Sequence, residues 1–204
     1  MPALSPWVIL VVSSLGEEIE LQDEERIARG LQTRDPEAWA GIYEEYFPRV
    51  YRYIALRVSD KTEAEDLAEQ VFLKALESIS SFKWRGVPVS AWLFRIARNQ
   101  VIDYRRTNKA KLQLPLDESL ASDDADPVGE AERNFDINQM VQAVGQLTQA
   151  QRDVIELRFT GELSTAEVAK VLGKSQGAVK VMQHSALAAL RRILSSTRHD
   201  EKEI

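Results

Sequence analysis

The chain has 204 residues, 44% of them hydrophobic and 28% charged, which is ordinary for a soluble globular protein of one large or two small domains. It holds no cysteine and only two histidines, which excludes disulfides and thiolate metal sites, so we expect no metal and no cofactor. The net charge of −6 is unevenly spread, with +3 on residues 30–111, −6 on 112–134 and +3 on 135–198. Two basic blocks around an acidic segment are compatible with nucleic-acid binding despite the acidic total.

We expect no targeting segment in the N-terminal residues. The apolar run from Trp7 to Val12 is far shorter than the roughly 20 residues that a membrane-spanning helix needs. Residues 1–16 contain no lysine or arginine, which a signal peptide would have. We therefore expect a poorly ordered extension over residues 1–22, no insertion into a membrane, and a cytoplasmic protein.

Helix signals fill residues 23–111, the first predicted domain. Asp35, followed by Pro36, is a predicted helix N-cap. Residues 62–65 have the spacing of a capping box, and Ser90 is a further predicted cap. Apolar residues follow at helical spacing in two stripes. They are Leu67, Val71, Leu73, Ala75, Leu76 and Ile79 in the first helix, and Leu93, Ile96, Ala97, Val101 and Tyr104 in the second.

Aromatic and basic side chains alternate between Phe82 and Lys111. Basic groups neutralise phosphates, and exposed aromatic rings and arginine planes stack on unpaired bases, so this block suits DNA that is opened as well as bound. Trp92 and Phe94 lie on or beside the apolar stripe, and we expect them in the core. Trp84 follows no stripe, so both stacking on a base and a structural role stay open for it.

Residues 112–134 differ from the rest of the chain. They lack sustained periodicity and contain two prolines, a glycine and seven carboxylates. We interpret them as a flexible acidic linker between two domains.

A second domain is predicted over residues 135–198, before a tail of residues 199–204. Capping boxes begin at Thr148 and Ser164, and Gly173 ends the second of the helices that they start. All predicted elements are helices, so we expect an all-α protein made of two small helical domains.

Residues 164–190 have the form of a helix-turn-helix, a motif that binds DNA. Ala169 supplies the small residue where the helices cross, and Gly173 supplies the turn. Apolar residues of the second helix recur at steps of three and four from Val179 to Leu190. An ordinary helical hairpin is the alternative. In the DNA-binding reading the second helix enters the major groove, with candidate contacts from Lys174, Ser175, Gln176, Lys180, Gln183 and His184.

Three segments resemble the extracytoplasmic-function (ECF) sigma factors of bacterial RNA polymerase. Residues 64–75, AEDLAEQVFLKA, resemble the conserved region-two helix, and residues 91–106, AWLFRIARNQVIDYRR, resemble the promoter-melting and minus-10 segment. Residues 147–157 with 164–190 resemble region four, which reads the minus-35 element. The resemblance covers about residues 30–195 and implies a subunit that binds core RNA polymerase and directs it to promoter DNA.

The resemblance also implies roles for individual residues. The resemblance implies that core polymerase docks on Glu65, Asp66, Glu69 and Gln70. Without the resemblance, these residues would be interpreted as a solvated helix face. The residues implied to contact the minus-10 element and to melt the promoter DNA are Lys83, Trp84, Arg85, Arg95, Arg98, Asn99, Asp103, Arg105 and Arg106. Asp103 either reads a base or orients an arginine. The helix-turn-helix candidates would contact the minus-35 element, and the acidic linker would either mimic nucleic acid in the polymerase channels or serve as a spacer.

Family members commonly respond to a stress or envelope signal and are held by an anti-sigma factor, which the resemblance implies here as well. Met182 and Ser185 stand where the family often has basic residues, Gln183 replaces a common leucine, and the order Glu69-Gln70 is reversed. The minus-35 sequence is therefore not implied.

Two other classes of protein compete with this interpretation. A stand-alone helix-turn-helix regulator would leave the basic and aromatic block without a role. A nucleic-acid enzyme would need a glycine-rich phosphate loop, a metal cluster or a nucleophile beside a histidine, and the sequence shows none of these. We therefore expect no catalytic residue.

Overall fold

The computed structural model describes residues 24–58, 60–82, 87–108 and 139–200. Within these ranges the regular elements are all helical, and none of the helices is long and apolar enough to cross a membrane. The predicted N-terminal extension and linker lie outside the described residues, as do the candidate site residues Lys83, Trp84 and Arg85.

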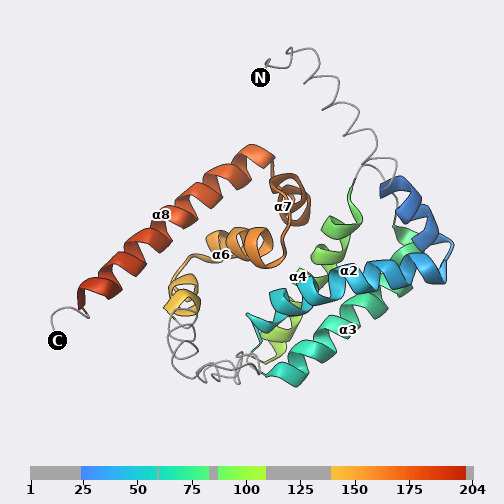
Figure 1. Cartoon of the computed structure of the whole chain (residues 1–204), viewed down its shortest axis with the longest axis horizontal. Helices are drawn as coiled ribbons and strands as arrows, with labels where there is room; N and C mark the ends of the chain where they lie inside the picture. Colours follow the sequence, from blue (N-terminus) through green and yellow to red (C-terminus); the bar gives the residue numbers. More distant parts are fainter. Residues whose placement is uncertain (1–23, 59, 83–86, 109–138, 201–204) are drawn as a thin grey trace, which may run out of the picture.

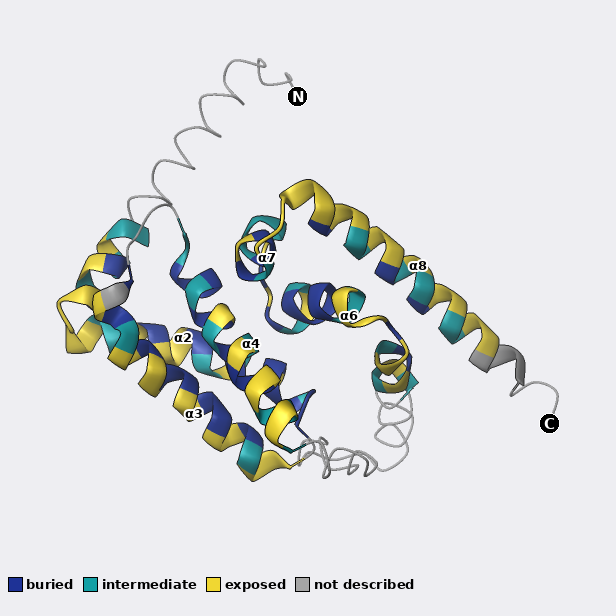
Figure 2. Cartoon of the chain, turned by 180° about the vertical axis from the view of Figure 1, so that it is seen from behind, coloured by how far each residue is buried: buried dark blue, intermediate teal, exposed yellow. Residues whose placement is uncertain are grey.

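The first half of the chain forms a bundle around three long helices (Figure 1). A helical stretch over residues 24–32 precedes them, and a 3-10 turn, η1 (Ile79–Ser81), follows the second. The long helices are α2 (Pro36–Ala55), α3 (Lys61–Ser78) and α4 (Val89–Thr107). Their inward faces bury a continuous apolar core, as the dark side of each ribbon shows (Figure 2).

The second half begins with a helical stretch over residues 139–145. It continues with α6 (Gln149–Ile155), the π-helical turn η2 (Glu156–Thr160), α7 (Thr165–Leu172) and the long α8 (Gln176–Asp200). Ala143, Leu147, Ile155, Ala186 and Leu190 form a small core of their own. Other buried residues of this half join the core of the first half, and α7 packs directly on α4. We call this packing of the second half on the first the closed arrangement.

Most helix ends follow the predicted capping chemistry. Asp35 accepts a hydrogen bond from the Glu37 amide at 3.1 Å, and the boxes at Thr148 and Ser164 are both formed. Gly173 adopts the left-handed conformation with φ of 64°, which ends α7 and which a residue with a Cβ rarely adopts.

Two predicted caps are wrong. Helix α3 begins one residue before Thr62, because Asp60 accepts a hydrogen bond from the Glu63 amide at 2.9 Å and so takes the cap. Helix α4 begins at Val89 without a side-chain cap, and the Ser90 hydroxyl donates to Glu167 of the second half instead.

The apolar stripe of α3 is confirmed only in part. Leu67, Val71, Ala75 and Ile79 are buried, but Leu73 and Leu76 are exposed. Helix α3 packs mainly on α2 and α4, and both leucines line an open groove between α2 and α3 instead of the core. In α4, Phe94 is fully buried and Trp92 packs against the core, as predicted.

Candidate nucleic-acid interface

Helix α4 divides the predicted minus-10 residues between two sides. Arg95, Arg98 and Arg105 follow one another at helical spacing on the side that meets the second half of the chain. Asn99, Asp103 and Arg106 are exposed on the neighbouring side. There the Asp103 carboxylate lies 3.2 Å from the Arg106 guanidinium, one turn away. This contact favours the interpretation of Asp103 as a residue that orients an arginine.

Arg98 is already paired with a carboxylate in the closed arrangement. Its Nε and Nη2 donate to Oδ2 of Asp153 in α6, at 3.1 and 2.8 Å. The Asp153 side chain is 7% exposed and the Arg98 side chain 30% exposed. Gln149 donates to the other carboxylate oxygen at 2.6 Å. Asp153 therefore occupies the guanidinium edge that a DNA phosphate would take.

A second ion pair is buried beside it. Arg57, two residues after the end of α2, pairs with Glu156 of η2, and the two side chains are 2% and 4% exposed. The guanidinium also lies over the Tyr53 ring, 3.7 Å from its centroid. Burial raises the pKa of Glu156 to about 7, although the charge of Arg57 acts in the opposite direction.

Arg105 has an unfavourable environment in this cluster. Burial lowers the pKa of its guanidinium, and the positive charge of Arg57 lowers it further. Glu156 opposes this, but Arg152 adds a further positive charge. Arg105 is thus a cation that would gain from contact with an additional anion, such as a phosphate.

Further polar contacts join the two halves, and one of them is an ion pair. Arg49 donates to the Gly161 carbonyl at 2.8 Å, and Arg95 donates to the Lys170 carbonyl. Arg52 pairs with Glu162 at 2.6 Å. A Cβ on Gly161 would lie 2.8 Å from Cε1 of Phe94, so this close approach of η2 to α4 requires glycine.

The predicted docking residues lie together on the exposed side of α3. Glu65, Asp66, Glu69 and Gln70 are all exposed. Gln70 accepts a hydrogen bond at 3.2 Å from Gln100 of α4, a buried polar residue that sequence reasoning missed. The sequence feature that could have indicated Gln100 is its position next to Val101, a member of the apolar stripe of α4. Gln100 links the predicted docking helix to the predicted promoter helix.

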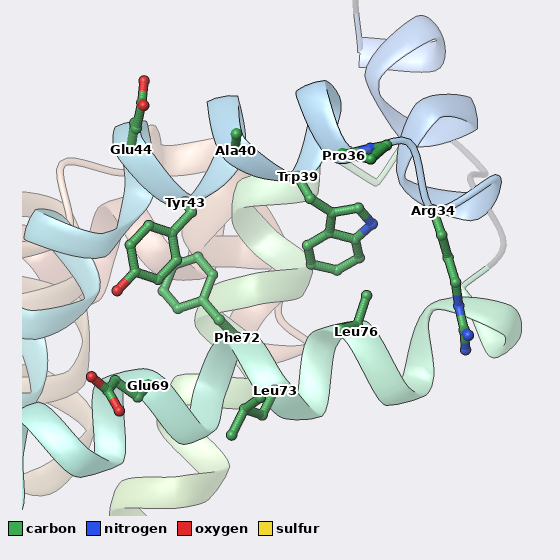
Figure 3. Close-up of a pocket in the computed structure, with 10 residues that line it drawn as sticks. All are labelled: Arg34, Pro36, Trp39, Ala40, Tyr43, Glu44, Glu69, Phe72, Leu73 and Leu76. Atoms are coloured by element: carbon green, nitrogen blue, oxygen red, sulfur yellow. The ribbon is translucent and has the colours of Figure 1, made fainter.

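An open apolar groove lies between α2 and α3, next to the docking residues (Figure 3). Its apolar walls are Trp39, Tyr43, Phe72, Leu73 and Leu76, and Glu69 lies at its edge. Leu73 is 59% exposed, one turn beyond Glu69 and Gln70. Sequence reasoning placed Leu73 in the core, so this apolar part of the surface was not anticipated.

The helix-turn-helix is formed as predicted by α7, the turn at Gly173 and α8. Val168, Val179 and Ala186 are fully buried between the helices. Of the six predicted contacts, Lys174, Ser175, Gln176, Lys180 and His184 are exposed, whereas Gln183 is half-buried. The Ser175 hydroxyl also accepts a hydrogen bond from the Ala178 amide at 3.2 Å and so caps α8.

Two of the departures from the family pattern have a structural reason. Met182 packs against the core rather than on the exposed side of α8. Ser185 accepts a hydrogen bond at 3.0 Å from Gln151 of α6. Both residues therefore serve the packing of α8.

Two family models match the chain, Sigma-70 region 2 over residues 42–111 and Sigma-70, region 4 over residues 143–192. The ECF RNA polymerase sigma factor BldN of Streptomyces coelicolor is similar, with 36% identity over 165 residues, which are 80% of this chain and 62% of that relative. The ECF RNA polymerase sigma factor SigX of Bacillus subtilis is 31% identical over 170 residues, which are 78% of this chain and 84% of that relative.

Solved structures share the fold. CnrH in complex with the cytosolic domain of CnrY has a TM-score of 0.62 at 23% identity, and the match covers 85% of this chain and 97% of that one. The sigma factor RpoE of Bartonella quintana, in complex with the anti-sigma factor NepR, has a TM-score of 0.59 at 22% identity and covers 76% of this chain and 96% of that one.

Proposed function

Because this chain belongs to the extracytoplasmic-function sigma factors, we propose that it divides transcription initiation among three surfaces. The exposed side of α3 docks on core RNA polymerase, α4 with the residues just before it contacts the minus-10 element, and α8 reads the minus-35 element. The chain binds core polymerase and directs it to promoters, and catalysis belongs to the polymerase. The observation that carries the proposal is that one bundle holds both an acidic and apolar exposed face on α3 and a row of arginines on α4.

The docking surface combines charge with apolar area. Glu65, Asp66, Glu69 and Gln70 supply the polar part, and the α2–α3 groove continues it with Leu73. A leucine that stays exposed in the wall of a groove contributes little to the free energy of folding. Its burial by a partner would instead stabilise the complex. Continuity with the acidic residues supports core polymerase as that partner.

Replacing Leu73 by Ser is expected to weaken binding to core polymerase by roughly tenfold or more, since burying a leucine contributes about 1.5–3 kcal/mol. Titration of fluorescently labelled chain with core polymerase measures this. The matched control is Met140→Ser, because Met140 is also exposed but lies in the helical stretch of the second half. Equal affinity of the Leu73 variant and the parent would remove the groove from the docking surface.

The promoter-facing residues are proposed to work in a state that differs from the closed arrangement. Arg98 has to exchange the Asp153 carboxylate for DNA, and Arg95 has to leave the Lys170 carbonyl. These exchanges favour separation of the second half from α4 when the promoter binds. Asn99 and Arg106 are exposed already. Lys83, Trp84 and Arg85, which lie outside the described residues, complete the proposed minus-10 contacts.

Control by a protein partner is part of the proposal. The two structural neighbours are bound to CnrY and to the anti-sigma factor NepR. We propose that this chain too is held in the cytoplasm by an anti-sigma factor and released by a stress or envelope signal.

A further inference from the structure

One apolar residue of α8 is distinguished by its exposure among the described residues. Val181 is 70% exposed, more than any other large apolar side chain of the described residues. The buried residues Val179 and Ala186, with Met182 beside them, define the side of α8 that packs on the second half. Val181 lies on the opposite side of the helix.

Folding does not account for valine at this position. A β-branched residue is a poorer helix former than alanine, and an exposed one contributes little by burial. Leu73, Leu76 and Tyr43, which are also exposed, share the α2–α3 groove. Val181 does not line that groove and lies among the residues proposed to contact DNA.

The surroundings of Val181 suit close approach of a flat polar surface. Gly177, one turn earlier, has open space where a Cβ would be, and Ala178 follows it. Side chains on a helix lean toward its N-terminus, so the valine methyl groups lie over the preceding turn, where Gly177 and Ala178 have no bulky side chain. Lys180 and His184, both exposed, lie on either side in the sequence and can donate hydrogen bonds.

We propose that Val181 is a specificity-determining residue that recognises the C5-methyl group of one thymine in the minus-35 element. The thymine methyl is the apolar group among the base edges of the major groove, where the other edges present donors and acceptors. A valine surrounded by donors therefore distinguishes thymine from cytosine at one position. The inference rests on the proposed docking of α8 in the major groove and adds to it the base that one residue reads.

The test uses holoenzyme reconstituted from the full chain and core polymerase. A promoter is first obtained by mapping transcription start sites on genomic DNA. Duplexes of that promoter are then made in which single thymines of the minus-35 element are replaced by deoxyuracil, which lacks only the methyl group. One such replacement is expected to weaken binding of the parent holoenzyme by about fourfold, the contribution of one buried methyl group.

The variant Val181→Ala, which favours the helix, is expected to bind thymine and uracil duplexes equally at that position, whereas Met140→Ala keeps the preference. A parent holoenzyme that binds the promoter but ignores every uracil replacement would overturn the inference and leave the proposed function intact. A Val181→Ala variant that lost affinity for both duplexes to the same degree, and so kept the parent's preference for thymine over uracil, would also overturn it, because Val181 would then not contact the methyl group. If the holoenzyme showed no promoter-specific binding at all, the proposed function itself would fail.

Discussion

Alanine at both Arg98 and Arg105 is expected to abolish open-complex formation by the holoenzyme while leaving its assembly with core polymerase intact. The two guanidinium groups share one side of α4, and neither belongs to the docking side of α3. An arginine contact with a base edge contributes about 1–3 kcal/mol, so loss of two contacts lowers promoter opening by roughly thirtyfold or more. Permanganate footprinting of unpaired thymines measures the opening.

Arg29→Ala is the matched control for this experiment. Arg29 is exposed and pairs with Glu25 on its own helical stretch, at 2.6 Å, so its loss should change neither opening nor assembly. Normal promoter opening by the double variant would contradict the assignment of α4. Loss of binding to core polymerase would contradict the division of roles between α3 and α4.

The substitution Asp153→Asn is expected to shift the free chain away from the closed arrangement. Asp153 is nearly buried, and both of the bonds that it accepts from Arg98 are charge-assisted. Hydrogen bonds to charged groups contribute about 1.5–3 kcal/mol, so the ratio of closed to open molecules should fall by roughly tenfold or more. Because the chain has no cysteine, dyes on single cysteines introduced at the exposed positions Lys61 and Ala188 report the separation by energy transfer.

The control is Glu162→Gln, which also removes a carboxylate that joins the two halves. Arg52 and Glu162 are each 52% exposed, and exposed pairs of this kind contribute at most about 1 kcal/mol. Energy transfer should therefore fall in the Asp153 variant and change little in the Glu162 variant. The same transfer in both variants and the parent would mean that Asp153 does not hold the two halves together. Circular dichroism of each variant checks that the helices stay folded.

The all-α fold and the order of its helices could be predicted because the signals are local. The caps at Asp35, Thr148 and Ser164 depend on groups within three residues of one another. The exceptions have physical causes. Asp60 competes with Thr62 for the start of α3, and Ser90 uses its hydroxyl for a partner 77 residues away.

The candidate site could be predicted as a set of residues but not as an arrangement. Helical spacing of apolar residues cannot tell the core from a groove that a partner covers, so Leu73 was placed wrongly. The pairing of Arg98 with Asp153 joins residues 55 positions apart, and no spacing rule predicts it. Val181 follows no motif, and the role proposed for it rests on its exposure and its neighbours in the folded α8.

Transcription in vitro with core polymerase and genomic DNA, followed by mapping of the 5′ ends, tests the central claim most directly. The holoenzyme is expected to produce discrete start sites that core polymerase alone does not produce, each preceded by shared minus-10 and minus-35 elements. If the chain instead bound a duplex operator tightly by itself, without affinity for core polymerase and without new start sites, it would act as a stand-alone regulator, which contradicts the account.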